Sequence, residues 1–132
     1  MAGIFARIAS GEITSYKIDE DDNFFAFLDV NPLVKGHTLV IPKNEIDYIF
    51  DMDDHLYADF QLFAMRIAKA LKKAIPCKKI GVAVIGLEVP HAHIHLVPLN
   101  IMDDINFSRS KIKLTESEFN EIADRIKFFL DS

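Results

Sequence analysis

Apolar and polar residues alternate along parts of the chain with the period of β-strands. Short apolar runs, either alternating with polar residues or nearly continuous, are bounded by turn-forming residues such as Asn31-Pro32. Because side chains in a strand point to opposite faces in turn, such runs indicate strands with at least one buried face. Five of these runs occur, at residues 14–21, 24–30, 37–42, 78–86 and 91–98.

Between the third and the fourth predicted strand the apolar period lengthens to that of a helix. Asp53 or Asp54 is expected to cap the N-terminus of this helix, and Pro76 to end it near residue 75. The apolar residues fall on one stripe, which is typical of a helix packed against a sheet. The stripe over 53–75 consists of Leu56, Phe60, Phe63, Ile67, Leu71 and Ile75.

Two further helical segments are expected near the ends of the chain. Thr115 and Glu118 form a capping box that opens a helix over about 116–130. Residues 4–10 fit one helical turn, and 99–114 is expected to be irregular surface. The order of elements predicts an α+β fold, in which a long helix and a C-terminal helix cover a five-stranded, mainly antiparallel sheet.

Composition and charge restrict the classes of partner. A chain of 132 residues without a linker or repeat is expected to form one domain, 1–132. Its 15 basic and 20 acidic residues give a net charge of −5, which argues against binding to nucleic acid or to an anionic membrane. A single cysteine, Cys77, excludes an internal disulfide, and neither a signal-peptide pattern nor a membrane-spanning apolar run is present. The expected location is the cytoplasm.

Three of the five histidines lie at alternate positions in the stretch VPHAHIHLVP, residues 89–98. In a strand, His91, His93 and His95 would share one face, and the apolar residues between them would share the other. Adjacent imidazoles resist simultaneous protonation, so we expect their pKa values to be lowered and coupled. A neutral imidazole near pH 7 is a competent base or nucleophile.

The residues alone leave three interpretations of this histidine row open. It could be a polar sheet face without chemistry. Two neighbouring histidines could share a zinc ion, which would need a further ligand such as His37 or a carboxylate. Alternatively, the imidazoles could bind a phosphate and attack its phosphorus.

The histidine row and the segments before it resemble the histidine-triad (HIT) superfamily of nucleotide hydrolases and transferases. The shared motifs are H-x-H-x-H, the opening IFARIASGEI and the run FLDVNPLVKGHTLVIPK, in the order of the family. They cover about residues 4–98 and leave 99–132 as a C-terminal extension with a predicted helix. The resemblance implies the fold predicted above, joined into a two-fold homodimer.

The resemblance also implies roles for individual residues. His93 would be the nucleophile that attacks the α-phosphorus of a purine nucleotide and forms a nucleotidyl-histidine. His91 and His95 would orient its ring and hold phosphate oxygens, and His37 would complete the set. Asp29 would accept the ribose hydroxyls. The remaining matched positions would form an apolar slot for the purine: Ile4, Phe5, Ile8, Phe27 and Val30.

These residues also have purely structural interpretations when each is taken alone. Asp29 precedes Asn-Pro and fits a turn. His37 could simply begin a strand, and the apolar residues of the slot could be ordinary core. Only their joint order along the chain favours the functional interpretation.

Two departures from the family pattern bear on the chemistry. Gly3 and Ala6 stand where many bacterial members carry cysteines of a structural zinc site, and Glu45 occupies a candidate histidine position, so we expect no metal. Leu87 and Glu88 replace a glutamine and a serine or threonine in the loop before the triad. Our hypothesis is that Glu88 serves as an acid for the leaving group or binds a cationic part of the substrate. The alternative is that Glu88 only faces solvent.

The sequence therefore predicts a phosphohydrolase of the phosphoramidase type without a cofactor. It would act on purine nucleotidyl substrates through covalent His93 and release a nucleoside monophosphate. The alternatives are a dinucleoside polyphosphate hydrolase or nucleotidyl transferase, and a non-catalytic nucleotide-binding module. Lys35, Lys43 and Arg109 are candidate phosphate contacts, and the segment 108–111 could reach the active site.

Overall fold

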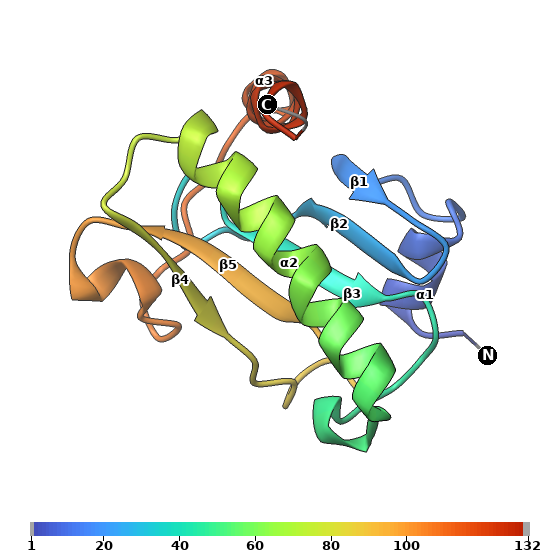
Figure 1. Cartoon of the computed structure of the whole chain (residues 1–132). Helices are drawn as coiled ribbons and strands as arrows, with labels where there is room; N and C mark the ends of the chain where they lie inside the picture. The colour runs from blue at the N-terminus through green and yellow to red at the C-terminus, as the bar shows by residue number, and fades with distance from the viewer. Residues whose placement is uncertain (1, 131–132) are drawn as a thin grey trace.

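An antiparallel sheet forms the centre of the computed structural model, which describes residues 2–130 (Figure 1). Its strands are β1 (Lys17–Glu20), β2 (Phe24–Leu28), β3 (Thr38–Pro42), β4 (Lys79–Ala83) and β5 (Ile94–Leu99). They lie in the order β1-β2-β3-β5-β4, and each neighbouring pair is antiparallel. The predicted α+β fold with a five-stranded antiparallel sheet is confirmed. The ends of the predicted domain, residues 1 and 131–132, lie outside the described residues.

One face of the sheet is covered by two helices, α2 (Asp54–Ala74) and α3 (Glu116–Phe128). Helix α2 crosses the strands, and α3 packs beside it near β1 (Figure 1). Asp53 caps α2 by accepting a hydrogen bond from Leu56 N, and the predicted capping box of Thr115 and Glu118 opens α3. Among the described residues, no helix has both the length and the apolar character needed to cross a membrane. The buried strand residues facing these helices are Ile18, Phe24, Ala26, Leu28, Val40, Ile94 and Leu96.

The opposite face of the sheet carries a second, smaller apolar cluster. The short helix α1 (Ile4–Ala9) supplies Phe5 and Ile8 to this cluster. The alternate residues of β2 and β3 complete it: Phe25, Phe27, Leu39 and Ile41. Because the two clusters use alternate positions of the same strands, the period of two in the sequence specifies both faces.

The boundaries of the elements differ from the prediction by at most three residues. The strand predicted over 91–98 begins only at Ile94, so His91 and His93 lie in the connection before it. Here Ala92 N donates to Ile46 O of a loop at 2.7 Å. The segment predicted to be irregular, 99–114, contains a short 3-10 helix, η2 (Met102–Ile105), and a second one, η1 (Ile49–Asp51), precedes α2. The other predicted elements are shorter than expected: 14–21, 24–30, 37–42, 78–86, 4–10, 53–75 and 116–130.

Candidate active site

Four histidines meet on the sheet face that carries the smaller apolar cluster. His95 lies in β5 opposite Leu39 of β3, and His37 precedes β3 on the same side as Leu39. His91 and His93 come from the connection before β5. All four side chains belong to buried residues, which expose between 2% and 8% of their surface. Polar groups of the protein contact most of their ring nitrogens.

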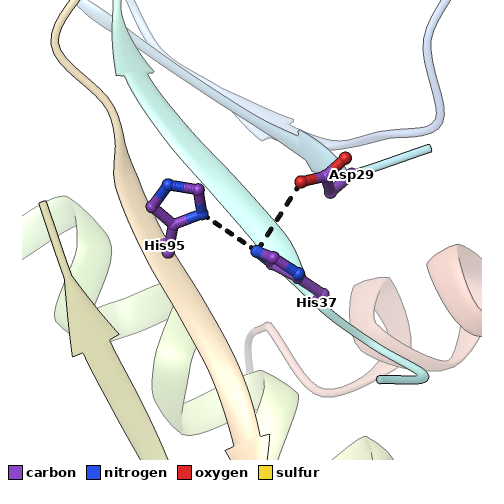
Figure 2. Close-up of side chains that lie close together, drawn as sticks. All are labelled: Asp29, His37 and His95. Atoms are coloured by element: carbon purple, nitrogen blue, oxygen red, sulfur yellow. Dashed lines mark hydrogen bonds and ion pairs between the residues drawn. The ribbon is translucent and has the colours of Figure 1, made fainter. Parts of the chain in front are cut away.

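A chain of hydrogen bonds orients the pair His37 and His95 (Figure 2). Leu33 N donates to His37 Nδ1 at 3.0 Å, so this nitrogen carries a lone pair and the proton of the neutral ring is on Nε2. His37 Nε2 then donates to His95 Nδ1 at 3.0 Å. The proton of neutral His95 is therefore on its Nε2, and one backbone N–H fixes the tautomer of both rings.

The loop between β2 and β3 holds this hydrogen-bond chain in place. Asp29 N donates to His37 O at 3.0 Å and closes the loop. Gly36 adopts a φ of 92°, which favours glycine. A Cβ at this position would lie 3.0 Å from the side chain of Ile75. The glycine therefore allows the loop to pass close to the end of α2 and brings Leu33 N against the ring.

Asp29 is a turn residue that also lies beside the histidine cluster. Its Oδ1 accepts a hydrogen bond from Asn31 N at 2.9 Å, as a turn residue does. Its Oδ2 lies 3.7 Å from His37 Nε2, at the edge of the histidine cluster (Figure 2). Burial raises the pKa of this carboxyl group.

His93 has the tautomer that leaves Nε2 with a lone pair. Its Nδ1 lies 2.7 Å from His91 O, and since a carbonyl only accepts, Nδ1 carries the proton of the neutral ring. His91 Nε2 donates in turn to Pro42 O at 2.7 Å. Among the described residues, His91 Nδ1 is a buried ring nitrogen without a hydrogen-bond partner. The rings of His93 and His95 lie edge to face with centroids 4.8 Å apart. The Nε2 lone pair of His93 and the Nε2–H of His95 therefore belong to neighbouring rings.

Burial favours the neutral form of three of these rings. Burial, with a smaller contribution from neighbouring positive charges, lowers the pKa of His37 to about 3 and that of His95 to about 4. Burial also lowers the pKa of His91, against the effect of its hydrogen bond to Pro42. The predicted direction is confirmed for His91 and His95, but desolvation is the main cause and repulsion between imidazoles the lesser one.

Aromatic rings pack on the histidines from two sides. Phe5 of α1 lies edge-on to His93 with centroids 5.1 Å apart. Phe107, from the segment after η2, lies edge-on to His95 at 4.8 Å and to His37 at 6.2 Å. The sequence prediction did not include Phe107. The one available signal was an isolated aromatic residue in a polar, irregular segment after the triad.

The residues predicted to form a purine slot divide into two groups. Phe5, Ile8 and Phe27 are buried in the smaller apolar cluster, where the rings of Phe5 and Phe27 pack edge-on at 5.8 Å. Ile4 and Val30 are more than half exposed, at 52% and 59%. Only these last two therefore offer a large apolar surface to a ligand, and the other three serve as core.

The positions that differ from the family pattern lie on two loops and at the start of the chain, where Gly3 precedes α1 and Ala6 lies within it. Glu88 is exposed on the connection between β4 and the triad. Gly3 N donates a hydrogen bond to Glu45 Oε1, which ties the start of the chain to the loop after β3. Gly3 and Ala6 offer no thiolate, so these residues do not fit the structural zinc of other members.

The zinc interpretation of the triad has a partial geometric counterpart. Ligand atoms of Asp29, His37 and His95 lie within 4.8 Å of one another (Figure 2). However, His37 Nε2 and His95 Nδ1 already share a hydrogen bond, whose proton a metal ion would have to replace. His37 Nε2 and His95 Nδ1 can therefore either share this hydrogen bond or bind a metal ion, but cannot do both.

Comparison with known proteins identifies the family. A model of the HIT domain matches residues 10–101. An uncharacterized HIT-like protein of Borreliella burgdorferi is 37% identical over 131 residues, which cover 93% of this chain and 94% of that protein. The chain therefore belongs to the HIT domain family. The adenosine 5′-monophosphoramidase HNT1 of Saccharomyces cerevisiae is 37% identical over 98 residues, 74% of this chain and 62% of the yeast protein.

Solved structures share the fold over nearly the whole chain. A Hit-like protein involved in cell-cycle regulation from Bartonella henselae superposes with a TM-score of 0.82 at 31% identity, covering 96% of this chain and 94% of that one. A Zn-bound histidine triad family protein from Mycobacterium smegmatis gives a TM-score of 0.80 at 27% identity, covering 98% and 94%. The α+β architecture with its antiparallel sheet is thus that of HIT proteins.

Proposed function

We propose that the protein is a cytoplasmic, single-domain nucleotide phosphohydrolase of the phosphoramidase type, acting through a covalent intermediate on His93. The observation that carries the proposal is the hydrogen bond from His93 Nδ1 to His91 O at 2.7 Å, which leaves the Nε2 lone pair for attack. Family membership and the 37% identity to a yeast adenosine 5′-monophosphoramidase support a purine nucleotidyl substrate.

In the first proposed step, His93 Nε2 attacks the α-phosphorus of the substrate. The Nε2–P bond forms while the bond from phosphorus to the leaving amine breaks, and the amine takes the electron pair of that bond and a proton from solvent, either directly or through Glu88. The His93 ring then carries a positive charge, because Nδ1 keeps its hydrogen. The carbonyl of His91 accepts a hydrogen bond from this N–H and stabilises the cation. The Nε2–H of His95 is the donor for a phosphate oxygen.

In the second step, a water molecule attacks the same phosphorus. The electron pair of the N–P bond returns to His93 Nε2, and the water releases a proton to solvent. The products are a nucleoside monophosphate and the neutral ring from which the cycle began. Neither step requires a cofactor.

Recognition of the nucleoside is assigned to the groups around the triad. Asp29 would accept the ribose hydroxyls, because its Oδ2 lies at the edge of the histidine cluster. Glu88 would protonate the leaving group or bind its cationic part, for which its exposed place on the loop before the triad leaves room. The purine would contact Ile4 and Val30, supported by the core residues Phe5, Ile8 and Phe27.

We further propose that the protein acts as a homodimer. On α2, Leu62 and Met65 are exposed near the middle of the helix, at 57% and 48%. The first half of α2 carries Asp54 and Asp59, and the second half is basic: Arg66, Lys69, Lys72 and Lys73. A two-fold axis that pairs two copies of α2 antiparallel would cover the apolar middle and bring opposite charges together. Sedimentation equilibrium of wild type and Met65→Glu tests this, since the variant should be monomeric.

The catalytic proposal is tested with a fluorogenic adenosine phosphoramidate and a diadenosine polyphosphate as separate substrates. We expect His93→Ala to lose at least about 1000-fold in turnover of the phosphoramidate, as when a covalent nucleophile is removed. His55→Ala is the matched control, because His55 is an exposed histidine at the start of α2. Near-normal hydrolysis by His93→Ala would contradict the nucleophile assignment.

The same assay separates the alternative functions. Turnover of the dinucleotide alone, still dependent on His93, would favour a dinucleoside polyphosphate hydrolase. Nucleotide binding without His93-dependent turnover would favour a binding module. Full activity after exhaustive chelation would count against a zinc ion at Asp29, His37 and His95.

A further inference from the structure

The segment 106–112, which follows η2, forms a wall of the candidate active site. Arg109 Nη2 donates to Leu33 O at 2.7 Å, and Ile112 N donates to Pro32 O at 3.0 Å. Both acceptors belong to the loop that orients the histidine pair. Phe107 packs on both rings of that pair. Segment 106–112 thus contacts the site through its backbone, an arginine and an aromatic ring.

Lys111 is held at this wall by carbonyl groups of its own segment. Its Nζ donates to Phe107 O at 2.9 Å and to Arg109 O at 3.3 Å. An ammonium group has three N–H donors, so these two bonds leave one for a further acceptor. The side chain is therefore held in place, and one N–H of its ammonium group remains available as a donor.

The charge of Lys111 acts on the groups at one edge of the histidine cluster. Burial is the largest influence on the pKa of Asp29, His37 and His95, and the Lys111 charge works to lower the pKa of all three. The contacts agree with this, because Lys111 Nζ donates to the carbonyl of Phe107, whose ring packs on His95 and His37. The ammonium therefore lies beside the residue that borders the site where the proposed phosphate would bind.

Two of the lysine and arginine residues considered as phosphate contacts, Arg109 and Lys43, are already paired with acids. Arg109 Nη1 lies 3.3 Å from Asp103 Oδ2 and 3.5 Å from Asp104 Oδ1. Lys43 Nζ lies 2.9 Å from Glu20 Oε2. The buried imidazoles with strongly lowered pKa values are neutral near pH 7 and do not supply a charge either.

We propose that Lys111 is the cation that binds the phosphate of the nucleotide, through the N–H that its two carbonyl partners leave available. The inference rests on the proposed function, since it assumes a nucleotide in this site. A nucleoside monophosphate is a dianion near neutral pH, and the chain itself has a net charge of −5. A positioned ammonium therefore offsets repulsion in binding and the charge on the phosphate oxygens during attack.

The test compares binding of AMP and of adenosine, measured by titration calorimetry. Lys111→Met should bind AMP about tenfold more weakly and adenosine unchanged, because only AMP carries the phosphate. Lys111→Arg should recover most of the AMP affinity. Lys113→Met is the matched control, since it removes a charge from an exposed lysine two residues away and should bind both ligands like wild type.

Each outcome separates this inference from the proposed function. Unchanged AMP affinity in Lys111→Met overturns the inference, and an equal loss for AMP and adenosine does so as well, since it indicates a structural role. If turnover depends on His93 but AMP affinity does not depend on Lys111, only the inference fails. If AMP affinity depends selectively on Lys111 but no His93-dependent turnover occurs, the hydrolase proposal fails and the phosphate-binding role stands. Failure of wild type to bind either ligand refutes both.

Discussion

The two faces of the sheet bury side chains in different ways. The face under α2 and α3 is covered with apolar residues such as Phe24 and Ile94, whose burial needs no partner atoms. The opposite face buries four imidazoles nearly as deeply. Most of their ring nitrogens have a specific partner, for example Leu33 N at His37 and Pro42 O at His91. Apolar burial stabilises the first face, whereas the histidine part of the second face also depends on directional hydrogen bonds, which set the tautomers.

The apolar face should show the largest change in stability. Phe60 is fully buried on α2 and stacks on Phe24 with ring centroids 5.3 Å apart. Phe60→Ala should lower the free energy of unfolding by about 3–5 kcal/mol, because it leaves a cavity in the core. Urea unfolding measures this loss, with Phe50→Ala as control, since Phe50 is 66% exposed. A loss no greater than that of the control would contradict this description of the core.

The histidine face should make stability depend on pH. His37 and His95 have folded pKa values of about 3 and about 4, below their ordinary value of 6.5. As pH falls below 6.5, the unfolded chain binds protons that the buried rings do not, so the free energy of unfolding falls until these folded pKa values are passed. The total effect is on the order of a few kcal/mol, partly offset by Asp29, whose raised pKa acts in the opposite direction.

Urea unfolding between pH 7.5 and pH 4, a range chosen around these values, tests this prediction. His37→Phe should reduce the slope, whereas the exposed-site variant His55→Phe should retain more of it. The comparison between variants separates the buried histidines from the surface carboxylates, which also titrate in this range. Equal slopes in wild type and His37→Phe would contradict the assignment.

A smaller effect is expected on the orientation of His95. Replacing His37 with Phe removes the acceptor of Leu33 N and the donor to His95 Nδ1. Buried groups without partners cost about 1–3 kcal/mol, and His95 should no longer be held in one tautomer. Nitrogen NMR of the imidazoles reports the tautomer directly. A His95 that keeps its proton only on Nε2 in this variant would show that the pair does not determine its state.

The sequence predicts the sheet, the helices and the shared face of the histidines, because those features follow from local periodicity. It does not predict that the last strand begins at Ile94. That boundary depends on a hydrogen bond from Ala92 to Ile46, a residue far away in the chain. Local patterns also did not identify Phe107, since an aromatic residue in an irregular segment is given its position only by tertiary packing. The lowered histidine pKa values were expected from repulsion, but burial depth, their main cause, is known only from the fold.

The proposed roles of Glu88 and of the purine slot concern contacts with a ligand, which the periodicity of apolar residues does not predict. Apolar residues such as those of the slot are equally typical of a core. Three of them, Phe5, Ile8 and Phe27, are buried in the smaller apolar cluster. By contrast, Asp29 and His37 are brought within 3.7 Å of each other by the loop between β2 and β3. The order of motifs in the sequence could suggest this proximity, but only the folded loop determines the distance.

The most direct test of the account is to trap the covalent intermediate. Wild type would be mixed rapidly with an adenosine phosphoramidate, quenched, digested and analysed by mass spectrometry. The account predicts an adenylyl group on the Nε2 atom of His93, absent from His93→Ala. An adduct on a different histidine, or rapid turnover with no adduct at any time, would contradict it.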